Sequence, residues 1–233
     1  MASQPPPQFL ISEILPADIP SMIPVYNSAF KDDYLTNFTL PRAAITDTEW
    51  TRWLSHRISL SLKKPNCRNY KIFDTSTGEM AGHCRLQIPY VFSDEERREM
   101  EERDKREEEQ AKREGRHKIW PTGSNLEVVE LKFGALDEMK KKYVDEGEDY
   151  ICQLLAIDRL YQRKGLGSML LKHVLDMADA EGRKVYIEAT DAGWPLYKKL
   201  GFEDIDIIEI DVSKWGGDRI GTNKIMMRQP KKS

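Results

Sequence analysis

The residues with the clearest potential for chemistry in this chain form a short glycine-containing turn, Gln162 to Gly167. The turn joins an apolar run, Tyr150 to Ile157, to a segment with apolar residues at helical spacing, and a second apolar run, 184–188, follows after Gly182. A strand, a glycine turn and a helix in this order direct several free backbone N–H groups and the positive end of a helix dipole at one point. The segment therefore predicts a site for the phosphate groups of a nucleotide or coenzyme, within a parallel strand-helix-strand unit.

The spacing of the glycines argues against two kinds of nucleotide site. The sequence contains no G-x-x-x-x-G-K-[ST] motif, which disfavours the P-loop of nucleoside triphosphatases. Gly165 and Gly167, with Glu188 about twenty residues further on, match part of a dinucleotide-binding fingerprint. However, Leu170 stands where that fingerprint needs its third glycine, and the unit occurs once rather than as a repeat. A dinucleotide is therefore disfavoured as well.

A longer stretch, 154–167, resembles the acetyl-CoA signature of the GNAT superfamily, the acetyl-CoA-dependent N-acetyltransferases, with its Q/R-x-x-G-x-G/A turn. A second stretch, from Pro195 to Phe202, resembles the family's L-Y-x-x-x-G-F helix end and stands at the expected distance. The resemblance covers residues 150–204 well, the hairpin that follows to about Arg228, and the N-terminal half only by the order of its elements. A family proline after the first strand is replaced here by Asp158-Arg159, while the turn itself is retained.

The GNAT resemblance implies a fold, a co-substrate and a binding site. The implied fold is α/β (α+β), a mixed, mostly antiparallel sheet with a central parallel strand pair, flanked by helices. The implied co-substrate is acetyl-CoA, with no metal. Backbone groups of the central strand hold the pantetheine arm and the acetyl carbonyl, and the glycine turn holds the pyrophosphate. The expected coenzyme-binding residues are Leu155, Ala156, Ile157, Gln162, Arg163, Lys164, Gly165, Leu166, Gly167 and Ser168.

Two residues are candidates for proton transfer, and each has an alternative structural role. Tyr197 matches the family tyrosine often assigned to protonate the leaving thiolate, a role that suits a phenol with a pKa of about 10. The same side chain can instead be a buried aromatic that anchors its helix. Glu188 is the candidate base that accepts the ammonium proton, and it can equally be a structural carboxylate. Gln153, within the first strand of the unit, either faces the reaction centre or caps a bulge.

Cysteine and histidine patterns argue for direct chemistry without a metal. No cysteine or serine stands in a nucleophile constellation, so we expect the amine to attack acetyl-CoA directly. Cys67, His83 and Cys84 lack the paired short spacings of zinc ligands, which predicts no metal site. The 3 cysteines are unpatterned, which favours a reducing compartment, the cytoplasm, over a disulfide framework.

Length and charge limit the remaining possibilities. At 233 residues the chain suits a single N-acetyltransferase domain over 1–233 rather than two full domains. A net charge of −3 provides no basic footprint for nucleic acid or an anionic membrane. Residues 1–8 lack the regions of a signal peptide, and no apolar run approaches a membrane span. We expect a monomer or homodimer acting on a small-molecule amine, with a protein or peptide N-acetyltransferase, or a non-catalytic acyl-CoA-binding module, as alternatives.

The elements that must position these residues follow the order strand, helix, helix, strand, strand. We expect a strand at 9–14, helices at 16–30 and 48–62, and a hairpin from strands at 70–73 and 81–88. Residues 93–118 are almost wholly charged, which predicts a solvated helix, frayed or partly disordered. A further helix is expected at 135–144, and strands at 203–212 and 224–228 form a closing hairpin. We interpret 89–148 as an insertion that forms a wall or lid of the acceptor site, although its charged part can equally be an inert arm.

Overall fold

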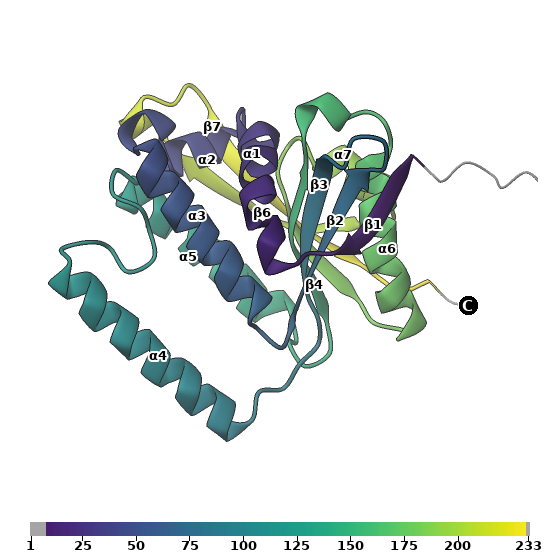
Figure 1. Ribbon diagram of the computed structural model, residues 1–233, viewed down its shortest axis with the longest axis horizontal. Coiled ribbons are helices and arrows are strands. Elements are labelled where there is room, and N and C mark those ends of the chain that lie inside the picture. The colour runs from purple at the N-terminus through teal and green to yellow at the C-terminus, as the bar shows by residue number, and fades with distance from the viewer. Residues whose placement is uncertain (1–7, 232–233) are drawn as a thin grey trace, which may run out of the picture.

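The computed structural model describes residues 8–231, which form a seven-stranded sheet with helices on both faces (Figure 1). The strands lie in the order β1-β2-β3-β4-β5-β7-β6. Neighbouring strands are antiparallel except β4 and β5, which are parallel. The mixed, mostly antiparallel α/β (α+β) fold with a central parallel pair is therefore confirmed. The signal-peptide prediction concerns residues 1–8, and all of these except Gln8 lie outside the described part.

The bounds of the elements are as follows. The strands are β1 Phe9–Glu13, β2 Cys67–Asp74, β3 Met80–Gln87, β4 Tyr150–Ile157, β5 Val185–Ala189, β6 Glu203–Asp211 and β7 Ile220–Arg228. The helices are α1 Ile19–Phe30, α2 Tyr34–Thr39, α3 Asp47–Leu62, α4 Asp94–Arg113, α5 Leu126–Tyr143, α6 Leu166–Ala180 and α7 Trp194–Lys199. Short 3-10 helices span Pro16–Asp18, Arg42–Ala44, Arg159–Tyr161 and Ser213–Trp215.

Successive residues of β5 show how the two faces of the sheet are covered. Ile187 belongs to an apolar cluster with Leu170 and the rest of the buried side of α6. Tyr186, which points to the opposite face because side chains alternate along a strand, belongs to a second cluster with Leu136 of α5. A third cluster joins α1 and α3 around Trp50. The glycine turn at the start of α6 is thus supported from one face of the sheet, while α1, α3 and α5 cover the other face.

Several helix boundaries differ from the sequence-based expectation. The helix expected from residue 16 begins at Ile19, after a 3-10 turn. The helix expected at 135–144 is α5, which begins at Leu126 because the side chain of Asn125 accepts a hydrogen bond from Val128 N (3.4 Å) and caps its start. The short helix α2 was not predicted, since its six residues offer too few turns for a periodic pattern.

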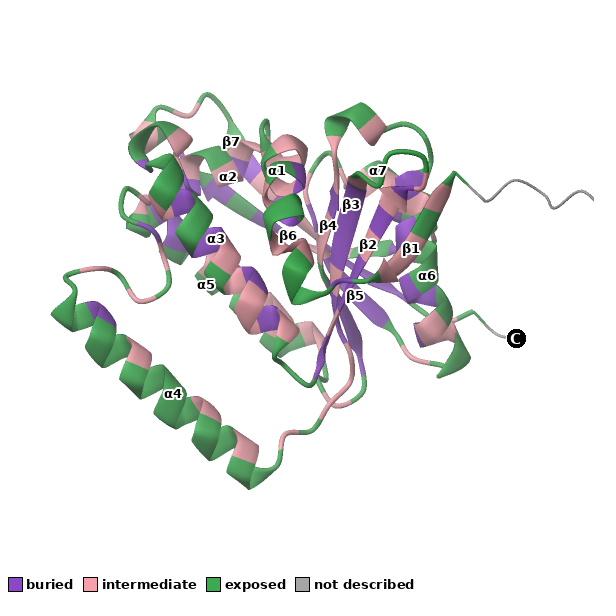
Figure 2. Ribbon diagram, in the orientation of Figure 1, coloured by how far each residue is buried: buried purple, intermediate pink, exposed green. Residues whose placement is uncertain are grey.

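The charged segment forms one continuous helix, α4, of 20 residues. Its start is a reciprocal capping box, in which Ser93 Oγ accepts from Glu96 N (3.2 Å) and Glu96 Oε2 accepts from Ser93 N (2.8 Å). Figure 2 shows exposed residues along nearly its whole length, and Ala111 is its buried residue. The prediction of a solvated helix therefore holds, while the expected fraying is not what the structure shows.

Candidate active site

The parallel strands β4 and β5 separate after three residue pairs. Tyr150, Ile151 and Cys152 pair with Val185, Tyr186 and Ile187, and β4 then continues to Ile157 without β5 beside it. On its other side β4 keeps its pairing with β3 as far as Ile157. Backbone groups of the second half of β4 therefore face an opening in the sheet rather than a neighbouring strand, which is how a strand presents hydrogen-bonding groups to a ligand.

Gln153 marks the point where the two strands part. Leu86 of β3 pairs with Cys152 and Arg85 pairs with Leu154, so Gln153 has no partner in the ladder and forms a bulge. Its side chain is exposed although β4 is the central strand, and its Nε2 donates to Gln87 Oε1 (2.8 Å). The sheet is therefore open to solvent here, and Gln153 occupies the bulge that the sequence left as one of two possibilities.

The glycine turn after β4 has the backbone shape of an anion site. Arg163 (φ 63°) and Gly165 (φ 81°) both adopt the left-handed conformation. The first i→i−4 hydrogen bond of α6 runs from Met169 N to Gly165 O (3.0 Å), so the N–H groups of 166–168 stand at the helix start without partners in the helix. A bent turn that leads into a helix N-terminus gathers N–H groups around a point suited to phosphate oxygens.

The two glycines of the turn are required for different reasons. A Cβ on Gly165 would meet no atom within 4 Å, so the residue is needed for its positive φ and not for space. A Cβ on Gly167 would lie 3.2 Å from Leu196 Cδ2 and 3.6 Å from Ile157 Cγ1. Gly167 therefore lets the start of α6 pack closely against Leu196 of α7 and against Ile157 at the end of β4.

Side chains beside the turn stabilise its path. The Nε2 of Gln162 donates to Ile157 O (3.1 Å), and Asp158 Oδ1 accepts from Leu160 N (2.9 Å). Lys164 Nζ lies 4.8 Å from the centre of the Tyr161 ring. Gln162 thus has a structural contact of its own, and Lys164 is the positive side chain held near the helix start.

Tyr197 lies on α7, on the α6 side of the sheet, with 7% of its surface exposed. Burial raises the pKa of Tyr197, and the nearby Cys152 and Cys84 raise it further. Among residues 8–231 its hydroxyl forms no hydrogen bond, so the proton it carries is not committed to a protein acceptor. Its packing role is also real, since a Cβ on Gly193 would lie 2.7 Å from the ring.

Glu188 follows the last residue of β5 that pairs with β4, on the face opposite Tyr197. Its Oε1 lies 3.6 Å from Lys140 Nζ and accepts from Tyr186 Oη (3.3 Å). Burial raises the pKa of Glu188 above the ordinary glutamate value, and the charge of Lys140 opposes this shift. The carboxylate is thus partly buried at the level where the sheet opens, with the two contacts that a structural role would also use.

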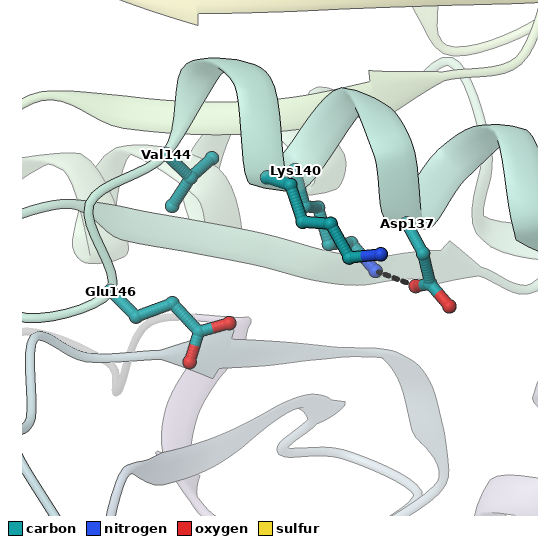
Figure 3. Close-up of a pocket in the computed structure, with 5 residues that line it drawn as sticks. Asp137, Lys140, Val144 and Glu146 are labelled. Carbon is teal, nitrogen blue, oxygen red and sulfur yellow. Dashed lines mark ion pairs between the residues drawn. The ribbon is translucent and has the colours of Figure 1, made fainter.

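A shallow pocket lies at the other end of β4 (Figure 3). It is lined by Asp137, Lys140, Lys141, Val144 and Glu146. Its wall residues from the loop before Tyr150 place it at the amino end of the strand, whereas the glycine turn follows the carboxyl end. Lys140 lines this pocket and also contacts Glu188 (3.6 Å), so the pocket lies beside the candidate base and away from the glycine turn.

A sequence profile described as an acetyltransferase (GNAT) domain matches residues 96–209, a range that contains β4, the glycine turn, α6 and α7. Residues 96–209 of the chain belong to the GNAT superfamily. This membership confirms the resemblance seen in the sequence and identifies the protein as an acyltransferase.

Solved GNAT structures share its fold over nearly the whole chain. Arylalkylamine N-acetyltransferase 2 of Aedes aegypti is 18% identical with a TM-score of 0.62, covering 97% of this chain and 100% of its own. The ribosomal-protein-S18-alanine N-acetyltransferase of Escherichia coli is 17% identical, with a TM-score of 0.52 and coverages of 97% and 96%. An acetyltransferase of Thermus thermophilus is 15% identical, with a TM-score of 0.54 and coverages of 95% and 97%. No curated protein matches the sequence.

The three cysteines of the chain are buried. Cys67, Cys84 and Cys152 are all free thiols. Burial raises the pKa of Cys152 to about 12 and that of Cys84 well above its ordinary value, so both stay protonated near neutral pH.

Within residues 8–231 no three His, Cys, Asp or Glu side chains gather as a metal site. No helix in that range is long and apolar enough to cross a membrane.

Proposed function

We propose that this protein transfers the acetyl group of acetyl-CoA directly to the primary amine of a small molecule. The observation that carries the proposal is the opening between β4 and β5, which lies beside a glycine turn of anion-binding shape. Acetyl-CoA is a thioester that carries a pyrophosphate. The opening would take its reacting carbonyl, and the glycine turn would take its pyrophosphate. Family membership supports the acyl transfer; acetyl-CoA, the amine and its size are our inference.

The turn and β4 would hold acetyl-CoA through backbone groups. The pyrophosphate would lie against the N–H groups from Arg163 to Ser168, with Lys164 supplying positive charge. Leu155, Ala156 and Ile157 would hydrogen-bond the pantetheine arm and the acetyl carbonyl along the unpaired edge of β4. Leu166 contributes by burial, since its side chain anchors the helix start in the core.

Tyr197 and Glu188 suit opposite ends of the proton path. Glu188, with its raised pKa, would accept the proton of the attacking amine, directly or through water. Tyr197 stays protonated across the neutral range and has no protein acceptor within the described residues, so it would protonate the departing thiolate. The two residues lie on opposite faces of the sheet, Tyr197 on the α6 side and Glu188 on the side of α5, where it contacts Lys140.

A direct transfer is favoured because the thiols among the described residues do not suit a nucleophilic role. A covalent acyl-enzyme intermediate needs a thiol or hydroxyl group that is activated as a nucleophile. The thiols near the opening, Cys84 and Cys152, are held in the protonated form by burial. Buried free thiols also suit the reducing cytoplasm, where we place the protein.

Thiol release from acetyl-CoA, measured across primary amines, amino acids and peptides, tests this function. We expect release with at least one small amine, a product heavier by one acetyl group, and initial-rate lines that intersect, as for a ternary complex. Parallel lines would show a covalent intermediate instead. Tight acetyl-CoA binding without release for any amine or peptide would identify a non-catalytic binding module.

A further inference from the structure

Two arginine side chains, on the side of the sheet that α1 and α3 cover, have no hydrogen-bond or ion-pair partner among the described residues. Arg57 belongs to α3 and Arg85 to β3, and both are partly buried. Neither forms an ion pair or a hydrogen bond with any residue of the range 8–231, and Arg85 Nε is fully buried without an acceptor. Arginine always carries its charge and offers five N–H donors, so two such groups without a protein acceptor are suited to bind an anion.

Arg85 lies where the sheet opens. It pairs with Leu154, the residue after the bulge, and therefore stands level with the point where β5 has left β4. Gln87, two residues further along the same face of β3, is held by the exposed Gln153. A group bound by Arg85 would thus lie beside the segment of β4 assigned to the acetyl carbonyl, on the face that carries Glu188.

Arg57 is fixed by aromatic rings from α3 and from the insertion. Its guanidinium carbon lies 5.4 Å from the ring centre of Trp53 and 5.2 Å from that of Trp120. Trp120 in turn packs on Phe133 of α5, with ring centres 4.6 Å apart. Cation–π contacts of this kind hold a guanidinium by its faces and leave its N–H edge free for an anion.

The charges around this pair come from several elements. Arg57 is near enough to Arg85 to lower the pKa of Arg85, whose main cause of lowering is burial. Tyr26 of α1 and Cys67 of β2 are the other titratable groups that act on Arg85. Asp33 influences Tyr26 but is engaged as the cap of α2, through Thr36 N (2.8 Å). Two positive charges that act on each other, partly buried and with no carboxylate partner among residues 8–231, are unfavourable until an anion binds near them.

We propose that Arg57 and Arg85 bind an anionic group, a carboxylate or phosphate, on the amine that accepts the acetyl group. This inference rests on the proposed N-acetyltransferase function and narrows its substrate class to small anionic amines. Guanidinium groups recognise both anions through paired N–H donors. Trp120 belongs to the insertion and positions Arg57. The insertion would thus form part of the wall of the acceptor site, as the sequence led us to expect.

Matched amines that differ in the anionic group test the inference. Phosphoethanolamine is compared with ethanolamine, and β-alanine with propylamine, by kcat/KM. Wild-type protein should prefer the anionic member of at least one pair. Arg85→Met and Arg57→Met should lower kcat/KM for that member on the order of thirtyfold or more, the usual effect of removing a buried charge contact, and change the neutral member little. The control is Arg52→Met, on the exposed side of the same helix and paired with Glu49 (3.1 Å).

The pair that shows the preference identifies the anion. A preference for phosphoethanolamine indicates a phosphate, and a preference for β-alanine indicates a carboxylate. A preference for the neutral amines, or one that both arginine variants retain, overturns the inference. Arg85→Met should also be at least as stable as wild-type protein without ligand, because it removes an unpaired buried charge. A clear fall in its melting temperature would instead make Arg85 a structural residue.

If no amine of the panel is acetylated, binding of inorganic phosphate tests the inference instead. With saturating CoA present to fill the glycine turn, phosphate should raise the melting temperature of wild-type and Arg52→Met protein but not of Arg85→Met. Equal effects on all three proteins, or none, overturn the inference. Failure of the proposed function gives a different result. Wild-type protein would then fail to bind acetyl-CoA, or would acetylate no amine, charged or neutral.

Discussion

A pair of glycine substitutions at the two ends of α6 separates coenzyme binding from backbone strain. Gly165 (φ 81°) precedes the helix and Gly182 (φ 67°) follows it, and a Cβ on either would meet no atom within 4 Å. Valine at either position therefore has the same defect, a side chain forced into the left-handed region. That strain costs about 1–2 kcal/mol, which in a chain of this length lowers the melting temperature by about 2–8 °C.

The two variants should differ only when acetyl-CoA is added. At a concentration about a hundredfold above Kd, a ligand stabilises the folded state by about 2.7 kcal/mol, or about 5–10 °C here. Wild-type protein and Gly182→Val should show this gain in a thermal-shift assay. Gly165→Val should lose it, because relief of the strained φ turns the N–H groups of the turn away from the phosphate position. A folded Gly165→Val protein that keeps the full gain would refute the assignment of the turn.

Three further predictions concern the chemistry and the insertion. Tyr197→Phe should lower kcat by about a hundredfold to ten-thousandfold while the Kd of acetyl-CoA is unchanged; near-normal turnover would leave Tyr197 as a packing residue. Because burial raises the pKa of Glu188, activity should fall as pH drops through that raised pKa and protonates the base, and Glu188→Gln should remove this acidic limb of the kcat/KM profile. An unchanged limb in Glu188→Gln would assign it to another group. Replacing 94–116 by a short flexible linker should leave the melting temperature nearly unchanged, since Ala111 is the buried residue of α4; loss of folded protein would contradict that.

The coenzyme half of the fold could be predicted because its signals are local. The turn from Gln162 to Gly167, the apolar strand before it and the stop at Gly182 lie within one stretch of chain, and each is dictated by residue types at fixed spacing. The spacing does not give every detail, since Met169 falls at an apolar position of the helical pattern of α6 and is 40% exposed. The periodicity identifies the helix but not the width of its buried side.

The acceptor half could not be predicted in the same way. Arg57, Arg85 and Trp120 come from a helix, a strand and a loop far apart in the chain, and only the sheet brings them together. A partial signal was present, because His83, Arg85 and Gln87 alternate with apolar residues in β3 and so mark a polar face. Nothing in that alternation shows that Arg85 lacks a partner, which depends on the neighbours that tertiary packing supplies.

The short pairing of β4 with β5 gives the sheet a seam. Strands β1–β4 on one side and β5–β7 on the other share backbone hydrogen bonding over three residue pairs, supported by the side chains of α6. A coenzyme bound along the free edge of β4 would extend the hydrogen bonding across this seam and resist its separation. Slower amide exchange at 153–157 would accompany that binding, and the lifetime of the protein against proteolysis would rise with it. The cell's supply of acetyl-CoA would then govern how much of this enzyme persists as well as how fast it works.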